Sequence, residues 1–257
     1  MPARIVRIFP NVETLSKAAA DEFVRCAGEA IAARGRFTVA LSGGSTPKKL
    51  YQLLASEPYR SQIDWGRVEF FWGDERCVPP DDKDSNYRMA REAMLAHLPI
   101  SAEHIHRMEA ERTDRDAAAR DYEAVLARVF GVSSGTEPPA IDLVLMGMGP
   151  CGHTASLFPY TQALDDNSRW VVPNHVPQLN TDRMTMTRPI LNRGRVVLFL
   201  VAGADKAERL AEVLAGPPDP KRLPSQLIQP EGQLIWFVEA AAAARLPSSL
   251  ARENVQG

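Results

Sequence analysis

Short apolar runs alternate along this chain with longer segments of helical periodicity. Runs at residues 36–41, 67–72, 141–146, 195–202 and 233–238 are mainly apolar and lack the polar residue at every second position that marks a half-exposed strand. Strands of this type are buried on both faces, as in a parallel sheet. Because helical segments separate the runs, the pattern predicts an α/β fold with a mainly parallel sheet and helices on both faces.

The helical segments show apolar residues that recur every three or four positions. They comprise residues 11–34, 46–56, 85–98, 114–130 and 204–215. Thr46 is predicted as the N-cap of the second segment and Pro47 as its first helical residue. A Pro-rich stretch follows at 216–224, but the roughly 35 residues beyond it are too few to fold alone. We therefore interpret it as a surface loop and residues 1–257 as a single domain.

Composition narrows the range of partners. The formal net charge is −2, so no overall field draws the protein to nucleic acid or to an anionic membrane. The longest apolar run is under half of a membrane span, and the first residues lack the apolar core of a signal peptide. The three cysteines, Cys26, Cys77 and Cys151, are odd in number and lack metal-site spacing. We therefore expect a cytoplasmic protein with reduced thiols and with no metal, nucleic-acid partner or membrane anchor.

The unusual stretches of the sequence follow the predicted strands. "SGGSTP" comes after residues 36–41, "GDER" after 67–72, "GMGPCGHT" after 141–146 and "GADK" after 195–202. In open α/β sheets the ligand binds outside the carboxyl ends of the strands. The four stretches are therefore predicted to form one ligand-binding edge.

The first stretch has the chemistry of a phosphate-binding loop. It contains Gly43, Gly44, Ser45 and Thr46. Glycines let backbone N–H groups approach an anion, hydroxyl groups add donors, and a helix N-terminus adds a favourable dipole. The stretch is not a Walker A loop, which requires GxxxxGK[ST]. An ordinary tight turn with a capping threonine is the alternative, and it stays open here.

Charged residues in two other stretches are candidates for contact with an anionic ligand. Arg76 offers a planar fork for a phosphate, and Asp74 could orient a water or accept a hydrogen bond from a substrate hydroxyl. A solvated charge cluster is the alternative. Lys206 is predicted in the first turn of a helix, where a cation opposes the helix dipole. Asp205 could offset that cost, but an anionic ligand would offset it better.

His153 lies in a glycine-rich turn at the predicted ligand edge. A neutral imidazole is the commonest general base, and flanking glycines let a ligand come close. No GxSxG, HExxH or CxxC motif is present, so neither a Ser–His–Asp hydrolase nor a catalytic metal is predicted. Cys151 is a conceivable nucleophile, but a small residue packed in a tight turn is the simpler interpretation.

Five segments together resemble the 6-phosphogluconolactonases of the glucosamine-6-phosphate isomerase/6-phosphogluconolactonase family. They are "LSGGSTPKKLYQLL", "FFWGDERCVPPDDKDSNYRMAREAML", "DLVLMGMGPCGHTASLFP", "RMTMTRPILN" and "LFLVAGADKAERL". The resemblance implies the three-layer α/β sandwich shared with glucosamine-6-phosphate deaminase and ribose-5-phosphate isomerase. It also implies an enzyme of the oxidative pentose phosphate pathway that hydrolyses a small sugar-phosphate lactone, 6-phospho-D-glucono-1,5-lactone, to 6-phosphogluconate without cofactor or metal.

The resemblance implies a role for each candidate residue as well. His153 would be the general base that activates water, and Asp74 would be the second catalytic residue. Asp74 and Arg76 would both contact the substrate. Phosphate and anion binding would fall to Gly43, Gly44, Ser45, Thr46, Arg183 and Lys206, with Arg76.

One position departs from the family. The family usually has aspartate in "GPDGHTASLFP", where this chain has Cys151. A thiol cannot replace a carboxylate in orienting an imidazole, so we expect His153 to be held differently or to be less basic. Two alternatives stay open. One is an amino-sugar-phosphate deaminase or isomerase, which the lack of an acidic residue between Thr154 and Asp165 argues against. The other is a non-catalytic sugar-phosphate-binding protein, which only Cys151 favours.

Overall fold

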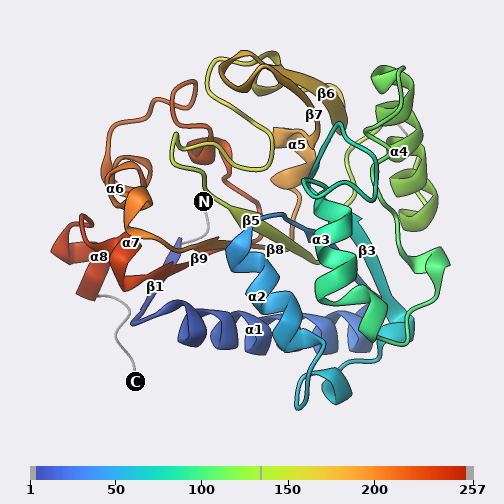
Figure 1. Ribbon diagram of the computed structural model, residues 1–257, viewed down its shortest axis with the longest axis horizontal. Coiled ribbons are helices and arrows are strands. Elements are labelled where there is room, and N and C mark those ends of the chain that lie inside the picture. The colour runs from blue at the N-terminus through green and yellow to red at the C-terminus, as the bar shows by residue number, and fades with distance from the viewer. Residues whose placement is uncertain (1–3, 134, 253–257) are drawn as a thin grey trace.

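The computed structural model describes residues 4–133 and 135–252. Its central sheet has six parallel strands in the order β1-β9-β8-β5-β2-β3 (Figure 1). The strands are β1 Ile5–Phe9, β2 Phe37–Leu41, β3 Val68–Trp72, β5 Leu143–Gly147, β8 Val196–Val201 and β9 Gln233–Glu239. All five predicted strands are present. The edge strand β1 was not predicted, because the exposed Arg7 interrupts its apolar run.

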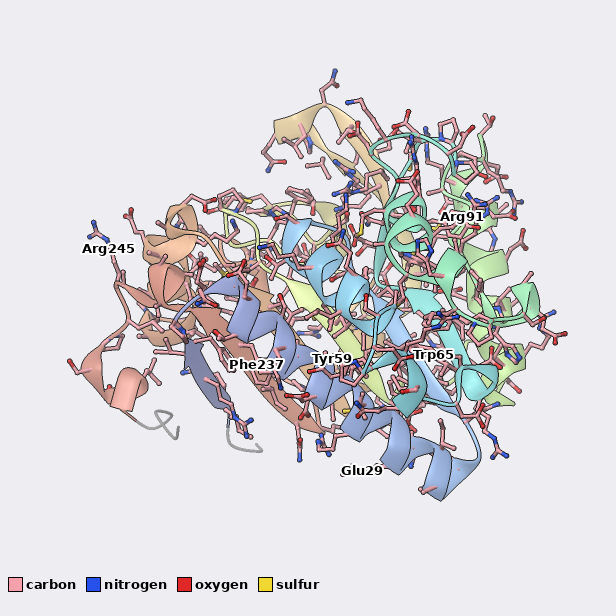
Figure 2. The ribbon with its side chains drawn as sticks, turned by 60° about the horizontal axis from the view of Figure 1, so that its bottom comes forward. Glu29, Tyr59, Trp65, Arg91, Phe237 and Arg245 are labelled. Atoms are coloured by element: carbon pink, nitrogen blue, oxygen red, sulfur yellow. The ribbon has the colours of Figure 1, made fainter. Side chains whose placement is uncertain are left out.

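Helices cover both faces of this sheet, which gives the three layers expected (Figure 1). They are α1 Val12–Arg34, α2 Ser45–Leu54, α3 Asn86–Ala93, α4 Arg115–Phe130, α5 Arg188–Leu191, α6 Ala207–Ala215, α7 Ala240–Ala243 and α8 Ser248–Arg252. On β3, Trp72 contacts Tyr87 of α3, whereas the next residue back, Phe71, points to the opposite face and contacts Tyr122 of α4. α2 packs between α1 and α3. Figure 2 shows α1 from its exposed side, on which Glu29 lies.

A second, antiparallel sheet of three strands follows the carboxyl end of β3. Its strands, in the order β4-β7-β6, are β4 Asp74–Arg76, β7 Thr181–Met186 and β6 Val171–Val176. This sheet was not predicted, because β4 consists of charged residues and β7 begins with polar ones, so neither strand shows an apolar run. Pairing between β4 and β7 sets Arg76 directly opposite Arg183. The second sheet therefore brings together two arginines that are far apart in the sequence.

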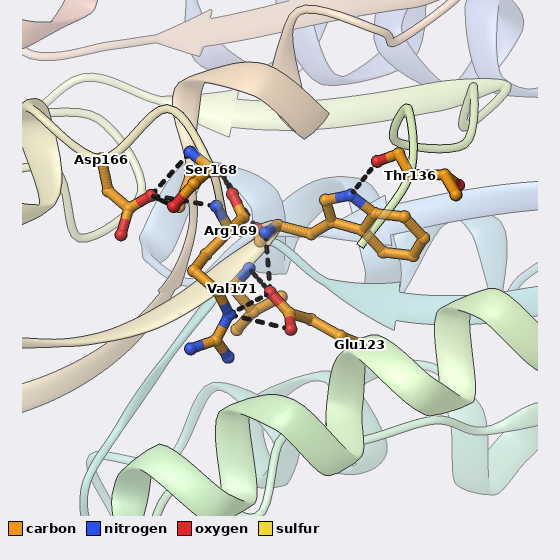
Figure 3. A network of polar contacts seen from close by, with 8 residues as sticks. Glu123, Thr136, Asp166, Ser168, Arg169 and Val171 are labelled. Atoms are coloured by element: carbon orange, nitrogen blue, oxygen red, sulfur yellow. Dashed lines mark hydrogen bonds and ion pairs between the residues drawn. The ribbon is translucent and has the colours of Figure 1, made fainter. Parts of the chain in front are cut away.

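Glu123 of α4 fixes the start of β6 (Figure 3). Its buried carboxylate accepts hydrogen bonds from the backbone N–H groups of Trp170 at 2.7 Å and Val171 at 2.9 Å, and from Nε of Arg169 at 2.9 Å. Buried donors lose their water on folding, and the carboxylate replaces it. α4 packs on the central sheet, so this network holds the second sheet in a defined place beside it.

Several helix boundaries differ from the prediction. The helix expected over 204–215 begins only at Ala207, because Ala204–Lys206 forms a 3₁₀ turn, so the prediction of Lys206 in its first turn is wrong. α2 begins at Ser45, so its N-cap is Gly44, whose φ is +107°, and the prediction of Thr46 as the N-cap is wrong. Glycine adopts positive φ without steric cost, and this lets the helix begin before Thr46. The helix predicted over 85–98 ends at Ala93, and a short 3₁₀ turn, Leu95–His97, completes the segment.

Candidate active site

The four loops predicted to bind a ligand lie next to one another. Strands β8, β5, β2 and β3 are neighbours in the sheet and run in the same direction. Their carboxyl ends therefore meet at one edge. The loops that leave this edge begin at Ser42, Gly73, Met148 and Ala202. The second sheet lies at the same edge, because β4 continues directly from the loop after β3.

His153 is packed closely in the turn after β5. Its ring stacks on Phe158, with the centroids 3.9 Å apart and the planes at 19°. Its Nδ1 lies 3.0 Å from Sγ of Cys151. A Cβ at residue 149 would lie 1.9 Å from Cε1 of the ring, so the turn accepts only glycine there. These contacts leave the imidazole little freedom to rotate.

The contact between Cys151 and His153 corrects one prediction. We expected that a thiol would not take the place of a carboxylate beside this imidazole. Sγ nevertheless lies at hydrogen-bond distance, because Gly152, with φ of +84°, reverses the chain between the two residues. A thiol is only a weak donor and a weak acceptor. Cys151 is therefore a weaker hydrogen-bond partner for the imidazole than a carboxylate would be.

The pKa of His153 is lowered from 6.5 to about 4. Burial is the largest cause, because it disfavours the charged imidazolium. The positive charges of Arg183, Arg76 and Lys206, in that order, lower the pKa further. His153 is therefore neutral at pH 7, as a general base must be, and three cationic side chains lie near it. The imidazole is thus less basic than a free one because of burial and these cations, whereas Cys151, the reason given for that expectation, is not among the causes.

Arg76 and Arg183 form a pair of like charges, and the carboxylates of Asp74 and Glu75 act on Arg183 without forming an ion pair with it. The two arginines are directly opposite in the β4–β7 ladder, and neither makes an ion pair within the described ranges. Arg76 donates from Nη1 to the carbonyl oxygen of Asp84 at 2.6 Å, whereas the buried Nε of Arg183 has no hydrogen-bond partner among the described residues. Burial, and then Arg76, lower the pKa of Arg183. Like charges opposite each other destabilise a sheet, so the pair leaves positive charge at this edge of the sheet that is not held in an ion pair.

Lys206 lies at the same edge but has a partner. It is the last residue of a 3₁₀ turn and the N-cap of α6. Its Nζ lies 3.0 Å from a carboxylate oxygen of Asp205. Asp205 thus offsets the charge of Lys206, as in the alternative considered above. The ammonium group still contributes to the positive field at His153.

The "SGGSTP" loop is held against β4 by Asn86. A Cβ at residue 43 would lie 1.8 Å from Oδ1 of Asn86, so Gly43 is required for this close approach. Nδ2 of Asn86 donates to the carbonyl oxygen of Asp74 at 3.0 Å. The first N–H groups of α2, at Ser45 and Thr46, have no partner within the helix and face outward from its N-terminus. The loop therefore retains the donors that an anion needs.

Asp74 and Glu75 are both buried and bind other parts of the protein. Oδ2 of Asp74 accepts a hydrogen bond from Oγ of Ser156 at 2.6 Å, which ties β4 to the turn that carries His153. Glu75 accepts from the backbone N–H groups of Asn86 at 2.7 Å and Tyr87 at 2.8 Å, at the start of α3. Burial raises the pKa of Glu75. The carboxylate pair therefore holds the loops together, and the group nearest to Nδ1 of His153 is Cys151 instead of Asp74.

Sequence reasoning missed three residues that shape the site. They are Asn86, Ser156 and Phe158. Each acts through a contact with a residue in another loop or in the same turn, and none carries a chemistry that draws attention by itself. Only the adjacency of Ser156 and Phe158 to His153 in "GHTASLF" could have suggested them.

Neither a metal site nor a membrane-spanning helix is present within the described residues. Among them, no group of three or more His, Cys, Asp or Glu side chains is placed to hold a metal ion. None of the helices in the described part of the chain combines the length and the apolar character needed to cross a membrane.

Comparisons with known proteins place the chain among related sequences. The family model described as glucosamine-6-phosphate isomerases/6-phosphogluconolactonase matches residues 10–236. A protein of a Nostoc species named 6-phosphogluconolactonase is 42% identical over 243 residues, which cover 95% of this chain and 98% of the relative.

Solved structures agree with this relationship. The structure described as 6-phosphogluconolactonase from Trypanosoma cruzi is 29% identical and superposes with a TM-score of 0.83, over 95% of this chain and 97% of the other. A monomeric glucosamine-6-phosphate deaminase is only 20% identical but reaches a TM-score of 0.77, over 94% of this chain and 99% of the other. This last likeness shows that the fold is shared.

Proposed function

The chain belongs to the glucosamine-6-phosphate isomerase/6-phosphogluconolactonase family, and we propose that it hydrolyses 6-phospho-D-glucono-1,5-lactone to 6-phosphogluconate with His153 as the general base. One observation carries the proposal. A neutral, closely packed imidazole lies in the positive field of Arg76 and Arg183, which form no ion pair in the described part of the chain. A base next to an anion-binding group fits a substrate that has a phosphate at one end and an ester carbonyl at the other.

The proposed mechanism follows from this arrangement. The phosphate of the lactone binds to Arg76, Arg183 and the loop of Gly43, Gly44, Ser45 and Thr46, with Lys206 adding positive charge. His153 then takes a proton from a water molecule, and the water oxygen attacks C1 of the lactone. Donors at the site stabilise the oxyanion, at about 2.7–4 kcal/mol for each well-placed donor. The C1–O bond breaks, and the ring oxygen receives a proton from the imidazolium, which restores neutral His153.

Asp74 enters this proposal in a revised role. We proposed contact with the substrate from the resemblance, and the carboxylate lies at the correct edge of the sheet. Its Oδ2 is bonded to Ser156 and its backbone carbonyl to Asn86. These bonds support a role in which Asp74 sets the position of the histidine turn relative to the phosphate loop.

The proposal also covers the setting in which the protein works. We propose a cytoplasmic enzyme that acts on a small molecule without a cofactor, a metal, nucleic acid or a membrane partner. The net charge of −2 and the absence of metal-site cysteine spacing support this. The deaminase alternative is disfavoured because no acidic residue follows His153 before Asp165. A non-catalytic sugar-phosphate-binding protein is separated from the enzyme by a turnover assay.

The decisive experiment compares His153→Ala with the unmodified protein on freshly prepared lactone, with spontaneous hydrolysis subtracted. We expect kcat to fall by about 10²–10⁴, because this is what a general base contributes. Binding of 6-phosphogluconate, measured by calorimetry, should remain, since the arginines are unchanged. His97→Ala is the matched control, because His97 is exposed and bonds only to a backbone carbonyl. A near-normal kcat in folded His153→Ala would disprove the assignment, and no turnover above background in the unmodified protein would favour the binding protein.

A further inference from the structure

We propose that Cys151 and Phe158 are positioning residues that hold His153 in one orientation and one tautomer, in which Nδ1 donates its hydrogen to Sγ of Cys151 and Nε2 is the basic atom. The inference rests on the proposed role of His153 as the general base. It adds which nitrogen takes the proton and which side chains decide this.

Phe158 sets the plane of the imidazole. Its ring is buried and stacks on His153 at 3.9 Å and 19°. The imidazole ring of His153 also occupies the space that a side chain at residue 149 would need. Rotation about the Cβ–Cγ bond of His153 would therefore break the stack or push the ring into the backbone of Gly149. The imidazole is kept in a plane that leaves its two nitrogens in fixed places.

Cys151 decides which nitrogen carries the hydrogen. Sγ lies 3.0 Å from Nδ1, and the ring has no other hydrogen bond among the described residues. If the thiol donated to Nδ1, the ring hydrogen would lie on Nε2, and neither nitrogen would have a free lone pair. If Nδ1 donates to Sγ, the lone pair of Nε2 is free to take a proton from water. Only the second arrangement gives a base.

The second arrangement also persists through the reaction. When Nε2 takes a proton, both ring nitrogens carry hydrogen, and Sγ can then only accept from Nδ1. A sulfur that accepts from the start needs no reorganisation, whereas a donating thiol would have to turn away. The turn itself is fixed, because the carbonyl oxygen of Gly152 accepts from N of Ser225 at 3.0 Å and from its Oγ at 2.9 Å. Cys151 is thus presented to the ring by a rigid backbone.

The test reads the tautomer directly, in the full chain labelled with ¹⁵N in its histidines. At pH 7 the two ring nitrogens of His153 should show shifts typical of a protonated Nδ1 and an unprotonated Nε2. In Cys151→Ala the signals should move toward protonated Nε2, and kcat should fall by about 10-fold with KM unchanged, a part of what the base contributes. Cys151→Asp, which restores a strong acceptor, should return both the tautomer and kcat. Cys151→Ser should keep most of the activity.

Matched control variants distinguish the positioning of His153 from a general loss of protein stability. Cys26→Ala removes a buried thiol from α1, and Phe130→Leu removes a ring from the end of α4, and both should leave the His153 signals and kcat unchanged. Phe158→Leu should broaden or shift the His153 signals and lower kcat with little effect on KM. A protonated Nε2 in the unmodified protein, which needs no variant, would overturn the inference even if His153→Ala is inactive. An expected tautomer with an active His153→Ala would overturn the proposed function instead.

Discussion

Two effects keep His153 neutral at physiological pH, and the binding of an anion changes only one of them. Burial is a permanent property of the turn, whereas the field of Arg183, Arg76 and Lys206 changes when an anion binds. A dianionic phosphate would cancel much of that field and make His153 more basic at the moment when the substrate is in place. The base would therefore be stronger in the complex than in the free protein.

This leads to a prediction about the pKa of His153. In the free protein, an NMR titration of the imidazole should give a pKa near the value of about 4 caused by burial and the three cations. Saturation with 6-phosphogluconate should raise this pKa, because the phosphate stabilises the imidazolium. Gluconate at the same concentration, which keeps the carboxylate but lacks the phosphate, should leave this pKa unchanged. A pKa that does not move with 6-phosphogluconate would place the phosphate away from Arg76 and Arg183.

The arginine pair gives a second prediction at the residue scale. Arg183→Gln removes a charge that repels Arg76 across the β4–β7 ladder. KM should rise by about 10-fold or more, since a charge-assisted contact to phosphate is lost. The melting temperature should stay equal or rise, because like charges directly opposite are destabilising. Arg188→Gln, at a half-buried arginine of α5 outside the ladder, is the control. A lower KM, or a strongly destabilised Arg183→Gln protein, would show that the pair serves stability and not the anion.

At the scale of elements, the site depends on how closely loops from separate strands approach one another. The phosphate loop after β2 touches β4 through Gly43 and Asn86, and β4 touches the histidine turn through Asp74 and Ser156. Each contact is short and buried. The loops therefore form one connected layer, in which a change in one loop displaces the next.

A substitution at Gly43 tests this connection. In Gly43→Ala the new Cβ would lie 1.8 Å from Oδ1 of Asn86, so Asn86 has to move and its bond to β4 is lost. We expect KM for the lactone to rise by about 10-fold or more, since small displacements of binding groups are costly. Gly28→Ala in α1 is the matched control, because no atom lies within 4 Å of a Cβ there. That control should keep KM and gain about 0.5–1 kcal/mol of stability from helix propensity. Unchanged KM in Gly43→Ala would mean that the loop does not hold the phosphate.

At the scale of the whole molecule, both sheets share one hydrophobic core. Buried side chains of the second sheet, such as Val171 and Met184, belong to the same cluster as those of the central sheet, such as Leu145 and Phe199. We therefore propose that the chain behaves as one domain. It should unfold in urea in a single transition, with circular dichroism and tryptophan fluorescence giving the same midpoint.

The pH dependence of that stability should contain a contribution from His153. Its pKa is about 4 in the folded protein and about 6.5 when unfolded. The contribution is fully present above pH 6.5 and is lost as the pH falls toward 4, because only the unfolded state then binds the proton. The difference in unfolding free energy between the unmodified protein and His153→Gln should therefore shrink over this range by up to about 3 kcal/mol. A constant difference would show that the imidazole is not held neutral by the fold.

The sequence by itself determined the parallel sheet, its helical layers and the edge at which we propose that the ligand binds. These follow from local patterns: apolar runs long enough for buried strands, helical periodicity between them, and glycine-rich loops after four of the strands. It also singled out His153, because an imidazole directly after a glycine-rich turn is unusual, and the family resemblance supplied Arg183. The second sheet, the start of α2 and the strand β1 were not determined, since their residues carry no apolar pattern of their own.

Only the tertiary structure decided how the site residues act on one another. That Arg76 faces Arg183 depends on the register between two polar strands, which no local signal reports. That Sγ of Cys151 reaches Nδ1 of His153 depends on a positive φ at Gly152, which the sequence allows but does not require. The low pKa of His153 arises from burial and from charges on three other segments. These properties depend on distances between atoms of separate segments, and those distances are set only when the chain folds.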